Sequence, residues 1–177
     1  MKKIILITFF FFIQIFNVLS SETKLKEAIN GLSSPWSLTF INKNRVLVTE
    51  KSGNIILIDL INKKIKKIQH DLQILEDGQG GLLEVLYYND QVFVSYSENL
   101  KKGNSSTSVA SAKFSENFLN FKNIFRAEPP IKSGYHFGSR LVIKDNLLYV
   151  TVGERGKGMI AQDPTKHPGS IIRIHLD

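Results

Sequence analysis

The sequence LLYVTV at residues 147–152 decides the fold, together with two earlier runs that match it. RVLVTE occupies residues 45–50 and QVFVSY occupies residues 91–96. Each run is rich in β-branched or aromatic residues and follows a turn of Asn, Asp or Lys, which predicts hairpin strands. A unit of about 40 to 50 residues built from four short antiparallel strands is typical of a β-propeller blade.

The sequence therefore predicts an all-β fold, a β-propeller of which about three blades are present. The predicted strands are residues 36–41, 45–50, 55–60, 61–72, 80–88, 91–96, 107–114, 124–126, 140–143, 147–152 and 170–176. A β-sandwich with coincidental spacing is the alternative. Because propellers close with about four to eight blades, residues 21–177 are expected to form the N-terminal part of a larger propeller domain. Self-assembly into a closed ring is a second possibility.

Residues 1–20 have the three-part build of a secretory signal peptide. Lys2 and Lys3 give a positive start, an apolar run covers residues 4–16, and Val18-Leu19-Ser20 offers a cleavage site. An uncleaved membrane anchor is the alternative, but the apolar run is short for a spanning helix. We expect cleavage, and therefore a periplasmic or secreted protein. With no cysteine in the chain, its stability has to come from the core, a cofactor or ions.

The charge pattern does not favour nucleic-acid binding. The formal net charge is +7, but the lysines are scattered except for Lys63, Lys64, Lys66 and Lys67. This cluster alternates with isoleucines, as on the solvent side of an edge strand, where lysines discourage pairing with another chain. Nucleic-acid binding requires a basic stripe with interleaved aromatic residues, and the sequence contains none.

A histidine and an arginine lie where a glycine-rich loop enters a predicted strand. His136 and Arg140 are four residues apart, so an extended backbone would place both on one side. Histidine takes up a proton near neutral pH, and arginine can grip an anionic group. A structural histidine and an arginine paired with a carboxylate are the alternatives. His70, His167 and His175 lack a supporting motif and are predicted to be surface or structural residues.

Three signatures, in this order, resemble the soluble quinoprotein sugar dehydrogenases of the glucose/sorbosone dehydrogenase family. The first is GLSSPWSLTF at residues 31–40, and the second is DGQGGLLEV at residues 77–85. The third is HFGSRLV at residues 136–142, followed by GERG at residues 153–156 and AQD at residues 161–163. Together they extend over nearly all of the mature chain.

The resemblance implies a six-bladed propeller that oxidises an aldose at its anomeric carbon to the lactone. The implied cofactors are pyrroloquinoline quinone (PQQ) on the axis and calcium, and an electron carrier, either a quinone or a cytochrome, is the implied partner. By resemblance His136 is the general base and Gln79 the active-site glutamine. Arg140 and Gln162 are the further cofactor-contact candidates. Glycines 78, 80, 81, 134 and 138 would let the backbone approach a flat anionic ring.

The sequence also departs from the family pattern. Tyr135 precedes the base where relatives carry polar or acidic residues, which bears on the tuning of the base and on sugar preference. In the family, later blades supply most cofactor contacts and the calcium ligands, so this chain alone is expected to hold the quinone weakly. Its metal ligands stay unassigned, although Glu154 and Asp163 are loop carboxylates of the kind that bind calcium.

Two other functions remain open. A propeller lactonase would need a ring of acidic metal ligands, and the sequence shows no such set. A non-catalytic propeller that binds a ligand or a protein is compatible with the fold. The presence of His136 and Gln79 in their motifs argues against that second function.

Overall fold

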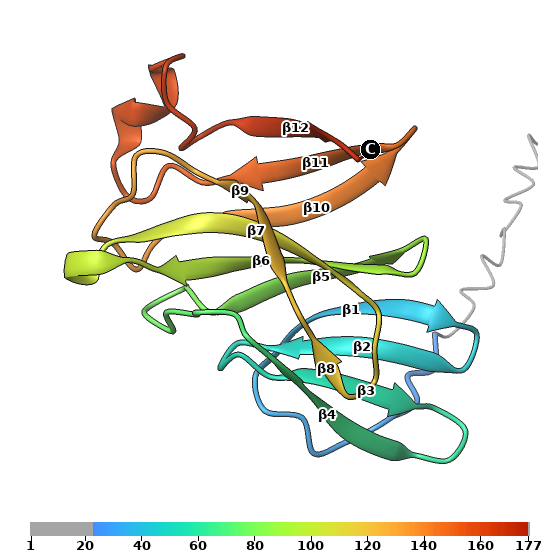
Figure 1. Ribbon diagram of the computed structural model, residues 1–177. Helices are drawn as coiled ribbons and strands as arrows, with labels where there is room; N and C mark the ends of the chain where they lie inside the picture. The colour runs from blue at the N-terminus through green and yellow to red at the C-terminus, as the bar shows by residue number, and fades with distance from the viewer. Residues whose placement is uncertain (1–22, 177) are drawn as a thin grey trace, which may run out of the picture.

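The computed structural model describes residues 23–176, which form three sheets that follow one another along the chain (Figure 1). The described part contains no α-helix, only the short 3-10 helices η1 (Lys101–Gly103) and η2 (Gly158–Gln162). Accordingly, none of its helices has the length and apolar character needed to cross a membrane. The signal peptide predicted for residues 1–20 lies outside the described residues.

Each sheet is built from strands that are mostly consecutive in sequence. The first contains β1 (Pro35–Asn42), β2 (Arg45–Glu50), β3 (Ile55–Asp59), β4 (Lys64–His70) and β8 (Phe118–Leu119), in that order. The second contains β5 (Leu82–Tyr88), β6 (Gln91–Asn99), β7 (Ser105–Lys113) and β9 (Lys122–Arg126). The third contains β10 (Gly138–Lys144), β11 (Leu147–Val152) and β12 (Ile171–His175). All pairs of these strands are antiparallel except β4 with β8.

The all-β prediction with about three repeated sheets is confirmed. The three matching runs are β2, the first six residues of β6, and β11, and each is in the second strand of its sheet. The strand predicted for residues 61–72 begins later, at Lys64. The reason is a turn in which Asp59 Oδ1 accepts hydrogen bonds from the backbone N–H groups of Ile61 and Asn62, 2.9 and 3.0 Å away.

The hydrophobic core lies between neighbouring sheets. Side chains alternate along a strand, and in β6 Val92 and Val94 belong to the cluster shared with the first sheet. Phe93, between them, belongs to the cluster shared with the third sheet. The second sheet is therefore buried on both faces and holds its neighbours in place.

Strand β8 reaches from the second sheet to the first and was not predicted. The segment between β7 and β9 pairs in parallel with the end of β4, with Phe118 opposite Gln69 and Leu119 opposite His70. The Leu119 side chain is fully buried in the core between these sheets. Residues 64–67 of β4 stay exposed, as the lysine pattern predicts, but the end of that strand is not an open edge.

The outer face of the first sheet is apolar and open. Trp36, Leu38 and Phe40 of β1 are 45%, 58% and 57% exposed. Together with side chains of β2, β3 and residues 28–32 they line a groove of about 600 Å³.

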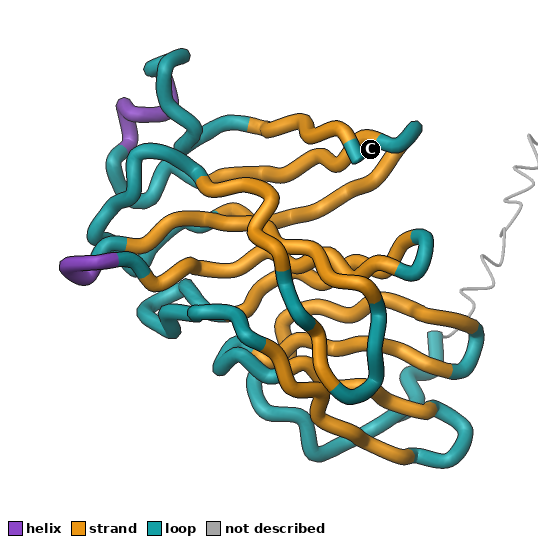
Figure 2. The backbone as a smooth tube through the Cα atoms, in the orientation of Figure 1, coloured by secondary structure: helices purple, strands orange, loops and turns teal. Residues whose placement is uncertain are grey.

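The loops that carry the sequence signatures gather at one end of the three sheets. Figure 2 shows the loops before β5 and β10 at the same end as η1 and η2, on the left of the view. This end is where the candidate functional residues meet.

Candidate functional site

His136 lies in the loop before β10, and its backbone is held from two sides. Its N–H donates to Gln79 Oε1 at 2.8 Å, and its carbonyl accepts from the Arg155 N–H at 3.2 Å. Its φ of 49° lies in the left-handed region, which is uncommon outside glycine. The side chain is 53% exposed, so the fixed backbone presents the imidazole to solvent.

The His136 ring is oriented by Glu154. Nδ1 of His136 contacts Glu154 Oε1, and the other oxygen, Oε2, accepts from the backbone N–H groups of Gly156 and Lys157. The hydrogen bond with His136 is the main cause that lowers the pKa of Glu154. Because an ionised carboxylate only accepts hydrogen bonds, Nδ1 of His136 carries the proton and Nε2 of the neutral ring is an acceptor.

Gln79 connects the second signature with the third. Its backbone N–H donates to the Gly134 carbonyl at 2.7 Å, in addition to the contact of its side chain with His136. The structure therefore brings together His136 and Gln79, two of the residues singled out by the sequence. Since Oε1 of Gln79 is engaged, the amide nitrogen is the part that remains to meet a ligand.

The glycines of these loops serve close packing within the protein. A Cβ on Gly78 would lie 2.5 Å from the Gly134 carbonyl oxygen, and one on Gly81 would lie 2.2 Å from the Lys51 carbonyl oxygen. A Cβ on Gly138 would lie 2.6 Å from the Gly153 nitrogen. Glycine is therefore required at these three positions by the packing of the protein's own loops, because a Cβ would collide with backbone atoms.

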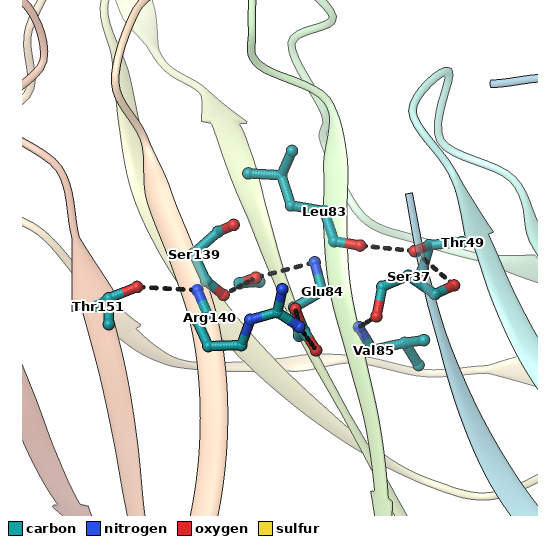
Figure 3. A network of polar contacts seen from close by, with 9 residues as sticks. Ser37, Thr49, Leu83, Glu84, Val85, Ser139, Arg140 and Thr151 are labelled. Carbon is teal, nitrogen blue, oxygen red and sulfur yellow. Dashed lines mark hydrogen bonds and ion pairs between the residues drawn. The ribbon is translucent and has the colours of Figure 1, made fainter. Parts of the chain in front are cut away.

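Arg140 forms an ion pair between two sheets. Nη1 lies 2.7 Å from Glu84 Oε2, and Figure 3 shows the two side chains pointing toward each other from β10 and β5. Glu84 is largely buried, whereas the Arg140 side chain is 68% exposed. The structural alternative considered for Arg140, a carboxylate partner, is thus present.

The extended backbone assumed between His136 and Arg140 is wrong. β10 begins only at Gly138, and the φ values of Gly138 and Ser139 are 75° and 92°. These left-handed residues turn the chain, so the spacing of four residues does not place both side chains on one side of a strand.

Gln162 stands apart from this group. It is the last residue of η2 and is exposed, and no hydrogen bond within residues 23–176 joins it to His136, Gln79 or Arg140. Asp163, next to it, pairs with Lys166 at 2.8 Å and accepts from Thr165.

The structure also shows the surroundings of the calcium-ligand candidate Glu154 and of two other histidines. Glu154 is engaged by His136, and the described residues contain no group of three His, Cys, Asp or Glu side chains that could hold a metal ion. His70 donates from Nε2 to the Gly53 carbonyl at 2.7 Å, and His167 accepts from the Glu128 N–H at 2.9 Å. These two histidines are structural, in agreement with the sequence.

Sequence reasoning missed the pairing of Glu154 with His136 and the role of Arg155. Arg155 is 2% exposed and contacts the loop that carries His136. The available signal was the GERG motif, in which two charged residues stand between glycines. The predicted hairpin was a second signal, because β10 and β11 pair with Gly138 opposite Val152, which brings the segments before β10 and after β11 together.

Comparisons with known proteins agree with this arrangement. Residues 32–177 match the family model described as Glucose / Sorbosone dehydrogenase. Aldose sugar dehydrogenase YliI of Escherichia coli is 29% identical over 153 residues, which are 81% of this chain and 41% of that protein.

Solved structures give the same picture. A glucose dehydrogenase superimposes with a TM-score of 0.80 and 31% identity over 85% of this chain and 46% of its own. The PQQ-bound form of aldose sugar dehydrogenase from Streptomyces coelicolor, 23% identical with a TM-score of 0.71, shares the fold over 85% of this chain and 47% of its own. The described sheets are therefore blades of a β-propeller that is not closed.

This chain spans about half the length of the relatives that it matches. The match nevertheless covers all three sheets and every loop of the site described above. The chain belongs to the glucose/sorbosone dehydrogenase family.

Proposed function

We propose that the protein oxidises aldose sugars at the anomeric carbon to lactones, with His136 as the general base. The observation that carries this proposal is the contact between His136 Nδ1 and Glu154, which leaves Nε2 as an acceptor on an exposed ring. Family membership, and a relative named as an aldose sugar dehydrogenase, support sugar oxidation.

The role of His136 is to take the proton of the anomeric hydroxyl on Nε2. The imidazolium that forms is stabilised by Glu154, whose carboxylate is held by the N–H groups of Gly156 and Lys157. The Gln79 side chain and the Arg155 N–H fix the His136 backbone, so that the ring does not have to be ordered during the reaction.

PQQ is the proposed cofactor, and when bound it supplies the two-electron acceptor for the sugar. Some of the residues described above could contact this cofactor. Gln79 is the best cofactor-contact candidate, because its amide nitrogen lies beside the base while its oxygen is engaged. Arg140 would have to share its guanidinium with Glu84, and Gln162 would reach the cofactor from η2. Calcium ligands are proposed on other blades, and a quinone or cytochrome is proposed to accept the electrons outside the cytoplasm.

We further propose that additional blades cover the open face of the first sheet. Trp36, Leu38 and Phe40 are exposed there, and the relatives in which this fold recurs are about twice as long. Full burial of an apolar side chain stabilises a protein by about 1.5–3 kcal/mol. Because these three are already about half buried, covering each one contributes about half of that, which favours a covering blade.

The direct test is reconstitution with PQQ and calcium, using the chain together with any coding sequence that follows it. A panel of aldoses is offered, dye reduction is followed, and the sugar product is identified. Lactone formed in proportion to reduced dye supports the proposal. Lactone hydrolysis without dye reduction would support a lactonase, and sugar binding without turnover would support a binding protein.

A further inference from the structure

Arg155, in the loop after β11, buries its charged side chain against the loop that carries His136. It is 2% exposed, and none of the ion pairs within residues 23–176 includes it. Burial lowers its pKa to about 10, so the guanidinium still carries its charge at neutral pH. The charge of neighbouring Glu154 acts on it, but a buried cation that forms no ion pair also needs compensation from hydrogen-bond acceptors around it.

Backbone oxygens provide that compensation. Nε donates to the Tyr135 carbonyl at 3.0 Å, and Nη1 donates to the Ser105 carbonyl at 3.0 Å. Nη2 donates to Ser105 Oγ at 2.8 Å, to the Ile131 carbonyl at 3.5 Å and to the Ser133 carbonyl. The guanidinium also lies 3.7 Å from the centroid of the Phe137 ring, a favourable cation–π distance.

These contacts have a pattern. Ile131, Ser133 and Tyr135 are alternate residues of one segment, and their carbonyls all point to the same cation. Ser105, at the start of β7, supplies two more oxygens and also pairs with Ile131 through the backbone. A convergent set of carbonyl and hydroxyl oxygens resembles the environment of a bound hard cation, except that the cation here is a side chain of the protein.

We infer that Arg155 is an internal cation that positions the proposed base, by gathering these oxygens and thereby fixing the peptide units on either side of His136. The side chain holds the Tyr135 carbonyl, and the main-chain N–H of Arg155 holds the His136 carbonyl. The preceding residue, Glu154, contacts the His136 ring. Two successive residues thus set both the backbone and the ring of His136.

The number and arrangement of these oxygens explain why position 155 is an arginine. Arginine offers five donors in a rigid plane, whereas lysine offers three on one nitrogen and a neutral side chain offers no charge. A lysine at position 155 can keep the charge, but its single nitrogen cannot reach all the oxygens around the edge of the guanidinium plane, which Nε, Nη1 and Nη2 contact separately. Arg155 is therefore a positioning residue and makes no contact with substrate.

The catalytic meaning of this inference rests on the proposed function of His136, but its test does not require activity. NMR of the imidazole nitrogens reports the Nδ1 proton that His136 shares with Glu154. His70, whose ring contacts Gly53 and the Leu72 N–H, is the internal reference for an intact fold. Arg126→Ala, which removes an arginine paired with Glu98 on the second sheet, is the matched control variant.

In Arg155→Ala we expect the His136 Nδ1 proton signal to be lost while the His70 signals stay unchanged. Added methylguanidinium, at concentrations far below those that denature, is expected to restore the His136 signal by occupying the same oxygens. Arg155→Lys is expected to lose the signal as well, and Arg126→Ala is expected to keep it.

An unchanged His136 signal in a folded Arg155→Ala or Arg155→Lys protein would overturn the inference. Failure of methylguanidinium to restore the signal in folded Arg155→Ala would also overturn it. If Arg155→Ala does not fold, Arg155→Lys decides by the same criterion. If neither folds, refolding of Arg155→Ala with methylguanidinium decides, since recovery supports the inference and no recovery contradicts it. Absence of sugar oxidation in the reconstituted parent protein, with its His136 signal intact, would instead count against the proposed function.

Discussion

His136 is defined chemically by its partner, because the carboxylate of Glu154 selects which ring nitrogen is protonated. A base that has to accept a proton on Nε2 needs its Nδ1 proton held in place, and the resulting imidazolium needs a nearby negative charge. The contact of Nδ1 with Glu154 Oε1 provides both. The two residues come from different loops, before β10 and after β11.

This pairing predicts a graded series at position 154. Glu154→Gln keeps an acceptor but removes the charge, and Glu154→Ala removes both. We expect kcat for sugar oxidation to fall about tenfold or more in Glu154→Gln, which corresponds to about 1.4 kcal/mol on the barrier. Glu154→Ala is expected to fall further, and His136→Ala furthest. Steady-state kinetics of the reconstituted enzyme checks the order, and equal rates in all three variants would contradict it.

The sequence could place His136 and Gln79 in a site only through the resemblance of their motifs. Their contact depends on how two loops of different blades meet, which local residue patterns do not encode. Glu154 differs, because it follows β11 whereas His136 precedes β10 of the same sheet, and the register of the β10–β11 hairpin brings the two together. Arg140 had a charge partner as its alternative, but the identity of Glu84 becomes visible only once β5 and β10 lie side by side.

At the scale of elements, β8 is a two-residue strand that joins two sheets. We expect Leu119→Ala to lower the free energy of unfolding by about 2–5 kcal/mol, because it leaves a cavity between the first and second sheets. Phe118→Ala is the matched control, since the Phe118 side chain is 48% exposed and its loss costs far less. Urea unfolding of both variants checks the difference, and equal effects would contradict the buried role of Leu119.

A second element-scale prediction concerns β6 and β9. Burial raises the pKa of Glu98, but hydrogen bonds from Arg126 and Ser108 outweigh burial and lower the pKa overall from 4.5. A lowered folded-state pKa contributes stability above pH 4.5, and this contribution is lost as the pH falls through the folded-state value.

Glu98→Gln is therefore expected to reduce stability at neutral pH and to weaken the loss of stability in acid. The measurement is the free energy of unfolding between pH 7 and pH 3. Glu76→Gln is the control, because Glu76 is exposed and takes no part in the hydrogen bonds of residues 23–176. An acid profile identical to that of the parent protein would refute the role of Glu98.

Most strands could be predicted because apolar runs and polar turns alternate clearly, as in β2, β6 and β11. β8 could not, because two residues give no periodicity and their partners, Gln69 and His70 of β4, lie far away in the sequence. The beginning of β4 was misplaced for a local reason, since the Asp59 side chain stabilises a turn within an otherwise strand-like run.

At the scale of the whole molecule, the open face of the first sheet is the feature that most needs a neighbour. Trp36 lies on this face and is the only tryptophan of the chain, so its fluorescence reports coverage directly. In the chain by itself, we expect red-shifted emission that acrylamide quenches readily. When further blades follow, we expect a blue shift and reduced quenching. Identical emission in the two forms would contradict coverage of this face.

The central claim is that a propeller of this family uses His136 as the base of a PQQ-dependent aldose oxidation. The most direct measurement compares aldose-dependent dye reduction by the reconstituted parent protein, His136→Ala and the exposed-residue control His175→Ala. The account predicts a loss of about 10²- to 10⁴-fold in His136→Ala, the usual contribution of a general base, with PQQ binding and stability retained. It predicts parent-like activity in His175→Ala. Parent-like activity in a folded, PQQ-loaded His136→Ala protein would contradict the account.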